Sequence, residues 1–198
     1  MSPKARLRRS LLRQRQAFDE AEWQARSQQL CQSLIRLPSF QMSRTILIYQ
    51  SVRQEPDLTW LFTELARKHQ SNPANPAKTW GLPRCHAGFQ LTWHTWSPGE
   101  PLDTDQYGVR VPLATAPQLT PGQVDLILVP AVGCDRRGYR LGYGAGYYDR
   151  LLQKPAWRTK PTIGIVFDFA LVAELPNDAW DCKLTGICTE YGYSESHP

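Results

Sequence analysis

Three continuous apolar runs stand out from an otherwise mixed pattern of polar and apolar positions. They are Thr45–Tyr49, Leu126–Val129 and Thr162–Phe167. Because nearly every position in such a run is apolar, each suits a strand that is buried on both faces in the centre of a parallel sheet. Further strands are predicted over Trp80–Pro83, over Phe89–Trp96, where apolar positions alternate with period two, and over Gly186–Thr189.

The first 37 residues carry helical signals. Ser2 is placed to cap a helix that has Pro3 at its first position. Asp19 and Glu22 predict a capping box for a second helix, whose end lies just before Pro38. We therefore expect an N-terminal helical segment over residues 1–37, packed on the body of the protein.

The pattern after residue 44 is that of an α/β protein. The strand Thr45–Tyr49 leads through a loop to a helix predicted over Leu58–Lys68, with Asp57 as its N-cap. Strand–loop–helix units of this kind build parallel sheets with helices on both faces. We predict one three-layer, Rossmann-like α/β domain over 1–198 with a mostly parallel sheet, a polar loop over 70–78 and a frayed tail over 191–198.

Composition narrows the class of protein. The chain has 198 residues, enough to bury a core in one domain, and no apolar run approaches the length that crosses a membrane. Its five cysteines are scattered without a CxxC pair, and its four histidines have no ligand spacing, so neither a disulfide framework nor a zinc site is predicted. No secretory segment is evident, and we expect a cytoplasmic protein.

The net charge of +5 is concentrated at the N-terminus. Residues 1–15 hold six of the 23 basic residues and no acid, so the other 183 residues carry seventeen basic and eighteen acidic residues. Such a segment is compatible with a transit peptide, a solvated face, or a clamp for a local anion.

The stretch 125–152, DLILVPAVGCDRRGYRLGYGAGYYDRLL, organises the rest of the chain. A buried strand is followed by a loop, by glycines at 142, 144 and 146, and by a short helix over Tyr147–Leu152. Glycines let the backbone approach a ligand, and the N–H groups at a helix start attract phosphate. Arg140 adds a fork of donors, and Asp149 is placed to hold a magnesium ion that accompanies phosphates. A flexible structural turn is the alternative, which the neighbouring residues disfavour.

The segment VPAVGCDRRGYRLGYGAGYYDRLL closely resembles the signature of the 5-formyltetrahydrofolate cyclo-ligase family, whose loop reads approximately RLGxGxGYYD. Two positions depart from the family pattern. Ala145 stands where many members have glycine, and Cys134 stands where phenylalanine is usual. The resemblance implies the fold shared by sugar-phosphate isomerases and CoA transferases.

The resemblance also implies an ATP site. Lys4 and Arg8 match a KxxxR pair that contacts ATP phosphates in the family, whereas Arg6, Arg9, Arg13 and Arg15 are expected to face solvent. Catalytic roles fall to Arg140, Lys4 and Tyr147. The residues implied to bind ATP are Lys4, Arg8, Arg140, Gly142, Tyr143, Gly144, Ala145, Gly146, Tyr147, Tyr148 and Asp149.

The folate and metal residues are likewise implied by the resemblance. Tyr49, Ser51 and Glu55 match a segment whose glutamate contacts folate, and Tyr107 and Tyr148 are further substrate-binding residues. An exposed loop tyrosine such as Tyr107 needs no such role. Asp181 is expected to complete a magnesium site with Asp149, and Asp178 is the competing candidate.

The function implied is ATP-dependent closure of 5-formyltetrahydrofolate to 5,10-methenyltetrahydrofolate, with ATP and Mg²⁺ as cofactors. We expect a monomer that binds a small-molecule substrate, with no nucleic acid and no membrane as partner. Two other functions are weighed: a sugar-phosphate isomerase on the same fold, which would consume no ATP, and a non-enzymatic nucleotide- or nucleic-acid-binding module, whose binding would depend steeply on salt.

Overall fold

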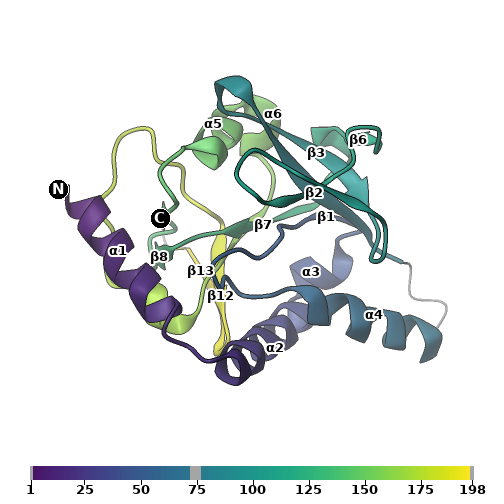
Figure 1. Ribbon diagram of the computed structural model, residues 1–198, viewed down its shortest axis with the longest axis horizontal. Helices are drawn as coiled ribbons and strands as arrows, with labels where there is room; N and C mark the ends of the chain where they lie inside the picture. Colours follow the sequence, from purple (N-terminus) through teal and green to yellow (C-terminus); the bar gives the residue numbers. More distant parts are fainter. Residues whose placement is uncertain (1, 72–76, 197–198) are drawn as a thin grey trace.

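An eight-stranded sheet forms the centre of the protein in a computed structural model that describes residues 2–71 and 77–196 (Figure 1). The strand order is β13-β12-β10-β7-β1-β2-β3-β6. In chain order the bounds are β1 Thr45–Leu47, β2 Thr79–His86, β3 Gln90–Trp96, β6 Gln118–Leu119, β7 Leu126–Pro130, β10 Thr162–Ile165, β12 Gly186–Thr189 and β13 Gly192–Glu195. The pairs from β12 to β2 are parallel and those at the edges antiparallel, so the predicted mostly parallel α/β sheet is confirmed.

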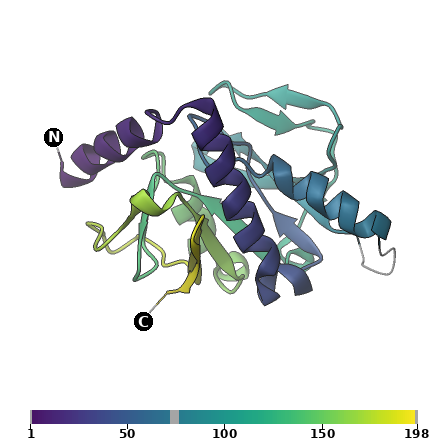
Figure 2. The same ribbon diagram turned by 90° about the horizontal axis from the view of Figure 1, so that it is seen from below.

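Helices cover both faces of this sheet. They are α1 Pro3–Arg15, α2 Glu20–Arg36, α3 Pro38–Met42, α4 Thr59–Ser71, α5 Tyr147–Gln153 and α6 Pro155–Arg158, with short 3-10 turns η1 Ala87–Phe89, η2 Pro121–Gln123 and η3 Asp168–Ala170. Figure 2 shows α2 and α4 laid across one face while α1 extends to the side. Within the described residues, each helix is too short or too polar to cross a bilayer.

Strand β7 shows why the apolar run was continuous. Leu126 and Leu128 are fully buried in a cluster with side chains of α2, α3 and α4. Ile127 and Val129 are fully buried in a second cluster with side chains of α1, α5 and α6. Since successive side chains of a strand point to opposite faces, a strand between two helix layers needs apolar residues at every position.

Local signals set the helix starts. The Ser2 hydroxyl accepts a hydrogen bond from Ala5 N at 3.2 Å, and the Asp19 carboxylate accepts one from Glu22 N at 2.8 Å. Both predicted caps are therefore confirmed. The capping box forms only in half, because the Glu22 carboxylate accepts from Arg26 Nε at 2.9 Å instead.

Two sequence-based expectations about secondary structure are corrected. The tail over 191–198 is not frayed where it is described, because Gly192–Glu195 forms β13 against β12. The predicted loop before the glycines contains β8 Gly133–Asp135 and β9 Arg140–Leu141, which join β11 Leu171–Val172 in a small sheet. Strands β4 Leu102–Thr104 and β5 Arg110–Pro112 form a separate hairpin. Strands of two to four residues are too short to show periodicity.

Residues 72–76 of the predicted 70–78 loop, and His197, lie outside the described part.

The strand order locates a crevice. The chain passes from β1 to its neighbour β2 on one side, and from β7 to its neighbour β10 on the other. Strands β1 and β7 are adjacent and parallel, so the sheet order reverses between them. Open α/β sheets bind ligands at the carboxyl ends of the strands at such a point.

Candidate active site

A cavity of about 620 Å³ opens at this crevice. Four segments supply most of its walls: the N-terminal turns of α1, the loop after β1, the glycine loop with α5, and the loop that holds Asp178 and Asp181. The volume is within the range of small-molecule sites. Every residue predicted to bind ATP lines it, as do Glu55 and Asp181.

The glycine loop takes the backbone shape that its sequence predicts. Gly144 has φ of 109° and Gly146 has φ of 73°, both in the left-handed region that favours glycine. Ala145, which lies between these glycines, does not have a positive φ, as expected for a residue with a Cβ atom. Gly146 is the N-cap of α5, so the first turn of that helix starts directly at the cavity wall.

Gly146→Ala is expected to lower the melting temperature by a few degrees. A left-handed alanine costs about 1–2 kcal/mol, and its Cβ would lie 2.7 Å from Arg150 Nη1. Gly142→Ala is the matched control, because its φ is not positive and its Cβ would meet no atom within 4 Å. Thermal unfolding of both variants measures the difference. Equal melting temperatures would contradict the strain assigned to Gly146.

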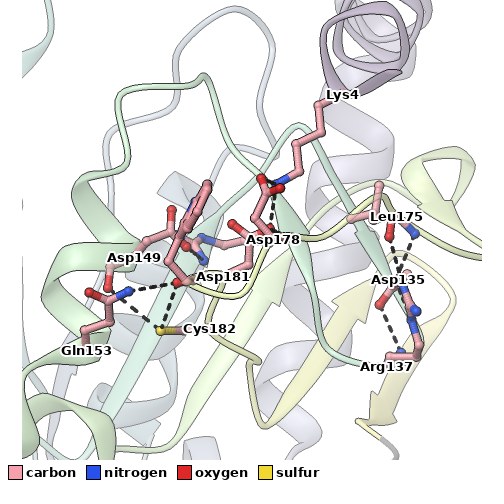
Figure 3. A network of polar contacts seen from close by, with 11 residues as sticks. Lys4, Asp135, Arg137, Asp149, Gln153, Leu175, Asp178, Asp181 and Cys182 are labelled. Atoms are coloured by element: carbon pink, nitrogen blue, oxygen red, sulfur yellow. Dashed lines mark hydrogen bonds and ion pairs between the residues drawn. The ribbon is translucent and has the colours of Figure 1, made fainter. Parts of the chain in front are cut away.

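Helix α1 lies against the glycine loop. Arg8 Nε donates to Gly142 O at 2.7 Å, and the Lys4 ammonium contacts Asp178 at 2.6 Å and Asp181 at 2.5 Å (Figure 3). Burial lowers the pKa of Lys4, but hydrogen bonds from its ammonium to the two aspartates outweigh this and raise the pKa above its ordinary value. Arg8 therefore brings a positive charge to the glycine loop, and Lys4 brings one to the aspartate loop on the wall of the same cavity.

Arg6, Arg9 and Arg13 are exposed, as expected. The expectation for Arg15 is wrong, because only 3% of this residue is exposed. Its guanidinium points inward from the last turn of α1 and binds carbonyl groups of two loops. The basic side chains of the N-terminal segment therefore have different surroundings: some face solvent, Arg8 contacts the glycine loop, and Arg15 is buried in the interior.

Arg140 lies in β9 with 5% of its side chain exposed, and its Nη1 is 2.9 Å from Asp149 Oδ1. This is a close ion pair, yet Nη1 is not aligned for a hydrogen bond and has no other partner in the described structure. The guanidinium carbon lies 5.7 Å from the centre of the Tyr148 ring. A buried, under-coordinated guanidinium beside the cavity is suited to an anionic ligand.

The two carboxylates predicted to hold magnesium are each paired with a cation of the chain, Asp149 with Arg140 and Asp181 with Lys4. Among the described residues, no group of three or more His, Cys, Asp or Glu side chains is arranged to hold a metal ion. Mg²⁺ commonly uses one or two carboxylates together with substrate phosphates and water. Two carboxylates on the cavity wall fit an ion that arrives with a nucleotide better than a resident metal.

Glu55 lies on the cavity wall, in the loop after β1, and is 2% exposed. Its Oε1 accepts from the Tyr143 hydroxyl at 2.9 Å and its Oε2 from Val52 N at 3.1 Å. Burial raises the pKa of Glu55 to about 7, although the Arg15 charge and the Tyr143 hydrogen bond act to lower it. A carboxylate retains further lone pairs, so Glu55 can still accept from donors on a flat heterocycle.

Aromatic side chains shape the remaining wall. Tyr148 lines the cavity, and its buried hydroxyl has no hydrogen-bond partner in the described structure. Tyr147 also lines the cavity, and its hydroxyl is 3.1 Å from that of Tyr107. Tyr107 itself is 58% exposed and is not a lining residue, so it reaches the rim only through Tyr147.

The cavity wall includes residues that the sequence did not single out, among them Gln50, Arg110, Arg150, Gln153 and Trp180. Gln50 sits between the predicted Tyr49 and Ser51, and Trp180 between Asp178 and Asp181. The sequence signal that could have identified Gln50 and Trp180 is their position next to residues already predicted to belong to the site. The side chain of Gln153 donates to the Trp180 carbonyl at 2.9 Å, which ties α5 to the aspartate loop.

The model of the 5-formyltetrahydrofolate cyclo-ligase family matches residues 1–190 of this chain. The chain is 35% identical over 196 residues to a 5-formyltetrahydrofolate cyclo-ligase of Mycolicibacterium smegmatis, covering 96% of this chain and 95% of the relative. It is 28% identical over 184 residues to the Escherichia coli K12 protein of the same name, covering 90% and 96%.

Solved structures give a similar result. The NMR structure of Aquifex aeolicus 5,10-methenyltetrahydrofolate synthetase superposes with a TM-score of 0.82 at 31% identity, covering 100% of this chain and 94% of that one. A 5,10-methenyltetrahydrofolate synthetase from Mycoplasma pneumoniae superposes with a TM-score of 0.72 at 27% identity, covering 96% and 99%.

Proposed function

This chain belongs to the 5-formyltetrahydrofolate cyclo-ligase family, and we propose that it converts 5-formyltetrahydrofolate and ATP into 5,10-methenyltetrahydrofolate, ADP and phosphate. The observation that supports this most directly is the placement of the glycine loop and Glu55 on the walls of one cavity. One end offers backbone N–H groups and cations for phosphates, and the other offers a buried carboxylate for the pterin. A sugar-phosphate isomerase would need no such second recognition group.

The chemistry accounts for the need for ATP. The N5-formyl group is an amide, whose oxygen is a poor leaving group. We propose that this oxygen attacks the γ-phosphorus, so that the O–P bond forms as the bond to ADP breaks. N10 then attacks the carbon of the resulting imidate phosphate, the C–O bond breaks so that phosphate leaves with the oxygen, and the N10 proton is lost to that phosphate. The enzyme must align the reactants, neutralise the transferring group and exclude water.

The residues divide into three roles on this proposal. Arg140, Lys4 and Arg8 neutralise the phosphates, and the backbone of the Gly142–Gly146 loop positions them. Glu55 accepts hydrogen bonds from the pterin amino and ring N–H groups. Tyr147 and Tyr148 lie between the two ligands, with the unpartnered Tyr148 hydroxyl available to one of them.

Magnesium would be held by Asp149 and Asp181 together with the nucleotide, where it would supply positive charge against the phosphates. Lys4 contacts Asp181 in this structure, so the incoming ion and phosphates would replace that ion pair and leave the ammonium to the nucleotide. The fold shared with sugar-phosphate isomerases and CoA transferases, the cytoplasmic location and the monomeric state stay predictions.

The test is a direct assay. Purified protein is mixed with Mg²⁺, ATP and 5-formyltetrahydrofolate, and the near-ultraviolet absorbance of the methenyl product is followed with and without ATP. We expect product only when ATP is present, with one ADP released per turnover. Folded protein that binds ATP but forms no product would retain the phosphate site and contradict the folate assignment.

Asp181→Asn is expected to raise the Mg²⁺ concentration for half-maximal rate by about tenfold or more, because losing a carboxylate ligand weakens metal binding. Asp178→Asn is the matched control and should change it by less than about twofold. Asp181 has 12% of its side chain exposed and Asp178 has 45%. A larger effect at Asp178 would assign the metal to that residue instead.

A further inference from the structure

The most unusual charged group outside the phosphate end is Arg15, which is almost fully buried. Its guanidinium makes three contacts. Nε donates to Arg53 O at 3.0 Å, Nη1 donates to Ala131 O at 3.2 Å, and Nη2 donates to the Tyr143 hydroxyl. Burying a guanidinium is costly unless its donors are satisfied, and these three contacts satisfy donors on each of its nitrogens. The same contacts join α1, the loop after β1, the end of β7 and the glycine loop at one point.

Tyr143 continues the connection. Its hydroxyl accepts from Arg15 and donates to Glu55 Oε1 at 2.9 Å. The ring lies beside the guanidiniums of Arg15 and Arg53, at 5.8 Å and 5.6 Å from its centre. A tyrosine from the phosphate loop is therefore held in place by two cations and directed at the carboxylate proposed to bind folate.

The backbone that carries Glu55 is strained and needs external support. Arg53 and Gln54 have φ of 48° and 56°, in the left-handed region that non-glycine residues rarely adopt. Arg15 binds the Arg53 carbonyl, the Gln54 side chain donates to Phe18 O at 3.0 Å, and Trp23 Nε1 donates to Glu55 O at 2.8 Å. The position of the Glu55 carboxylate thus depends on contacts from α1 and α2.

The titration of Glu55 depends on the same contacts. Burial raises its pKa to about 7, and Arg15, the Tyr143 hydroxyl, Val52 N and Arg53 act in the opposite direction. Tyr49 and Tyr148 face the carboxylate from the end of β1 and from α5, and both have raised pKa values because they are buried, so they are neutral near pH 7. The ionised form of Glu55, which accepts donors on a pterin, is favoured by the guanidiniums and by Tyr143.

We propose that Tyr143, anchored by Arg15, is a positioning residue that holds the Glu55 carboxylate aligned for the folate ring, and that it links the glycine loop to Glu55. This rests on the proposed function for its substrate. The physical link between the three side chains is testable without turnover. From the sequence alone, Tyr143 is predicted only as an ATP-binding residue and Arg15 only as a solvent-facing one.

The decisive variant is Tyr143→Phe, which keeps the ring between the two guanidiniums and removes the hydroxyl alone. In turnover assays we expect the KM for 5-formyltetrahydrofolate to rise about tenfold at pH 7, because a hydrogen bond to a charged group is lost, while the KM for ATP changes by less than about twofold. The acidic limb of kcat/KM for folate should move to higher pH, since removing a donor disfavours the ionised carboxylate. Tyr191→Phe, at an exposed tyrosine outside the cavity, is the control and should leave both unchanged.

A second measurement separates this inference from the function. The side-chain carboxyl carbons of glutamate are labelled with ¹³C, and the Glu55 signal is identified by its absence in Glu55→Gln. We expect its titration midpoint to be higher in Tyr143→Phe than in the unmodified protein, and also higher in Arg15→Lys, which cannot bridge the same three oxygens. Unchanged midpoints overturn the inference whether or not the protein turns over folate. If the unmodified protein shows no turnover but the two variants show the raised Glu55 midpoint, the proposed function alone is contradicted.

Discussion

Arg140→Ala is expected to lower kcat by about 10³-fold, the order of effect seen when a guanidinium that stabilises a transferring phosphoryl group is removed. Two effects combine at this position. The variant loses a positive charge whose side chain is only 5% exposed, in surroundings where charge is poorly screened. It also leaves Asp149, 2.9 Å away, without its cation, and an unpaired carboxylate repels phosphate.

The measurement is steady-state turnover of 5-formyltetrahydrofolate, with thermal unfolding to confirm that the variant is folded. Arg136→Ala is the matched control, because Arg136 is an exposed arginine close by in the chain and outside the cavity wall. Added guanidinium ions should restore part of the activity of Arg140→Ala and none in the control. Near-normal turnover would remove Arg140 from the mechanism.

Glu55→Gln is expected to raise the KM for 5-formyltetrahydrofolate by about 10²-fold or more, since hydrogen bonds to a charged acceptor contribute about 1.5–3 kcal/mol each. The glutamine side chain also has an NH₂ group, which would face the N–H donors of the folate or the Tyr143 hydroxyl. The glutamate carboxylate, in contrast, only accepts hydrogen bonds. ATP binding in the absence of folate should be retained, because Glu55 contacts the glycine loop only through the Tyr143 hydroxyl and not through the backbone predicted to hold the phosphates. Loss of ATP binding in folded Glu55→Gln protein would contradict the division of the cavity into two ends.

The same substitution should stabilise the protein at high pH. The pKa of Glu55 is raised from 4.5 to about 7 in the folded state, so folding favours the protonated form. Its contribution to stability is complete below pH 4.5 and is lost as pH rises through 7. Above pH 7 the buried charge costs about 1–3 kcal/mol, a cost that the neutral amide avoids.

Thermal unfolding at pH 5 and pH 8 measures this. Glu55→Gln should melt a few degrees higher than the unmodified protein at pH 8, with a much smaller difference at pH 5. Glu195→Gln, at an exposed glutamate outside the cavity, should show no pH-dependent difference. A Glu55→Gln variant that is less stable at pH 8 would mean that the carboxylate is already stabilised by its partners in the folded protein.

The charged residues predicted to bind ligands share one structural feature. Three of these charges are held by other side chains of the protein: Lys4 by Asp178 and Asp181, Arg140 by Asp149, and Glu55 by Tyr143. Arg8 is held by the Gly142 carbonyl. Such pairing keeps the groups in position before a ligand arrives. Ligand binding then exchanges partners rather than ordering free side chains, which reduces the entropy cost of binding.

The sequence by itself determined the elements whose signals are local. A continuous apolar run identified β7 because a strand between two helix layers must be apolar on both faces. Ser2 and Asp19 identified helix starts because capping involves residues three positions apart. The alternating glycines identified the cavity loop because glycine itself favours the left-handed backbone that Gly144 and Gly146 adopt.

Only the tertiary structure decided which side chains meet. Tyr143 and Glu55 are 88 positions apart, and they touch because β1 and β7 are neighbours at the point where strand order reverses. The burial of Arg15, one of six similar basic residues, follows from the direction in which the last turn of α1 faces two loops. Strand β13 forms because the edge of β12 is open to pairing. Each of these outcomes depends on strand order and on which face of an element is covered, and no pattern within a short stretch of sequence records either.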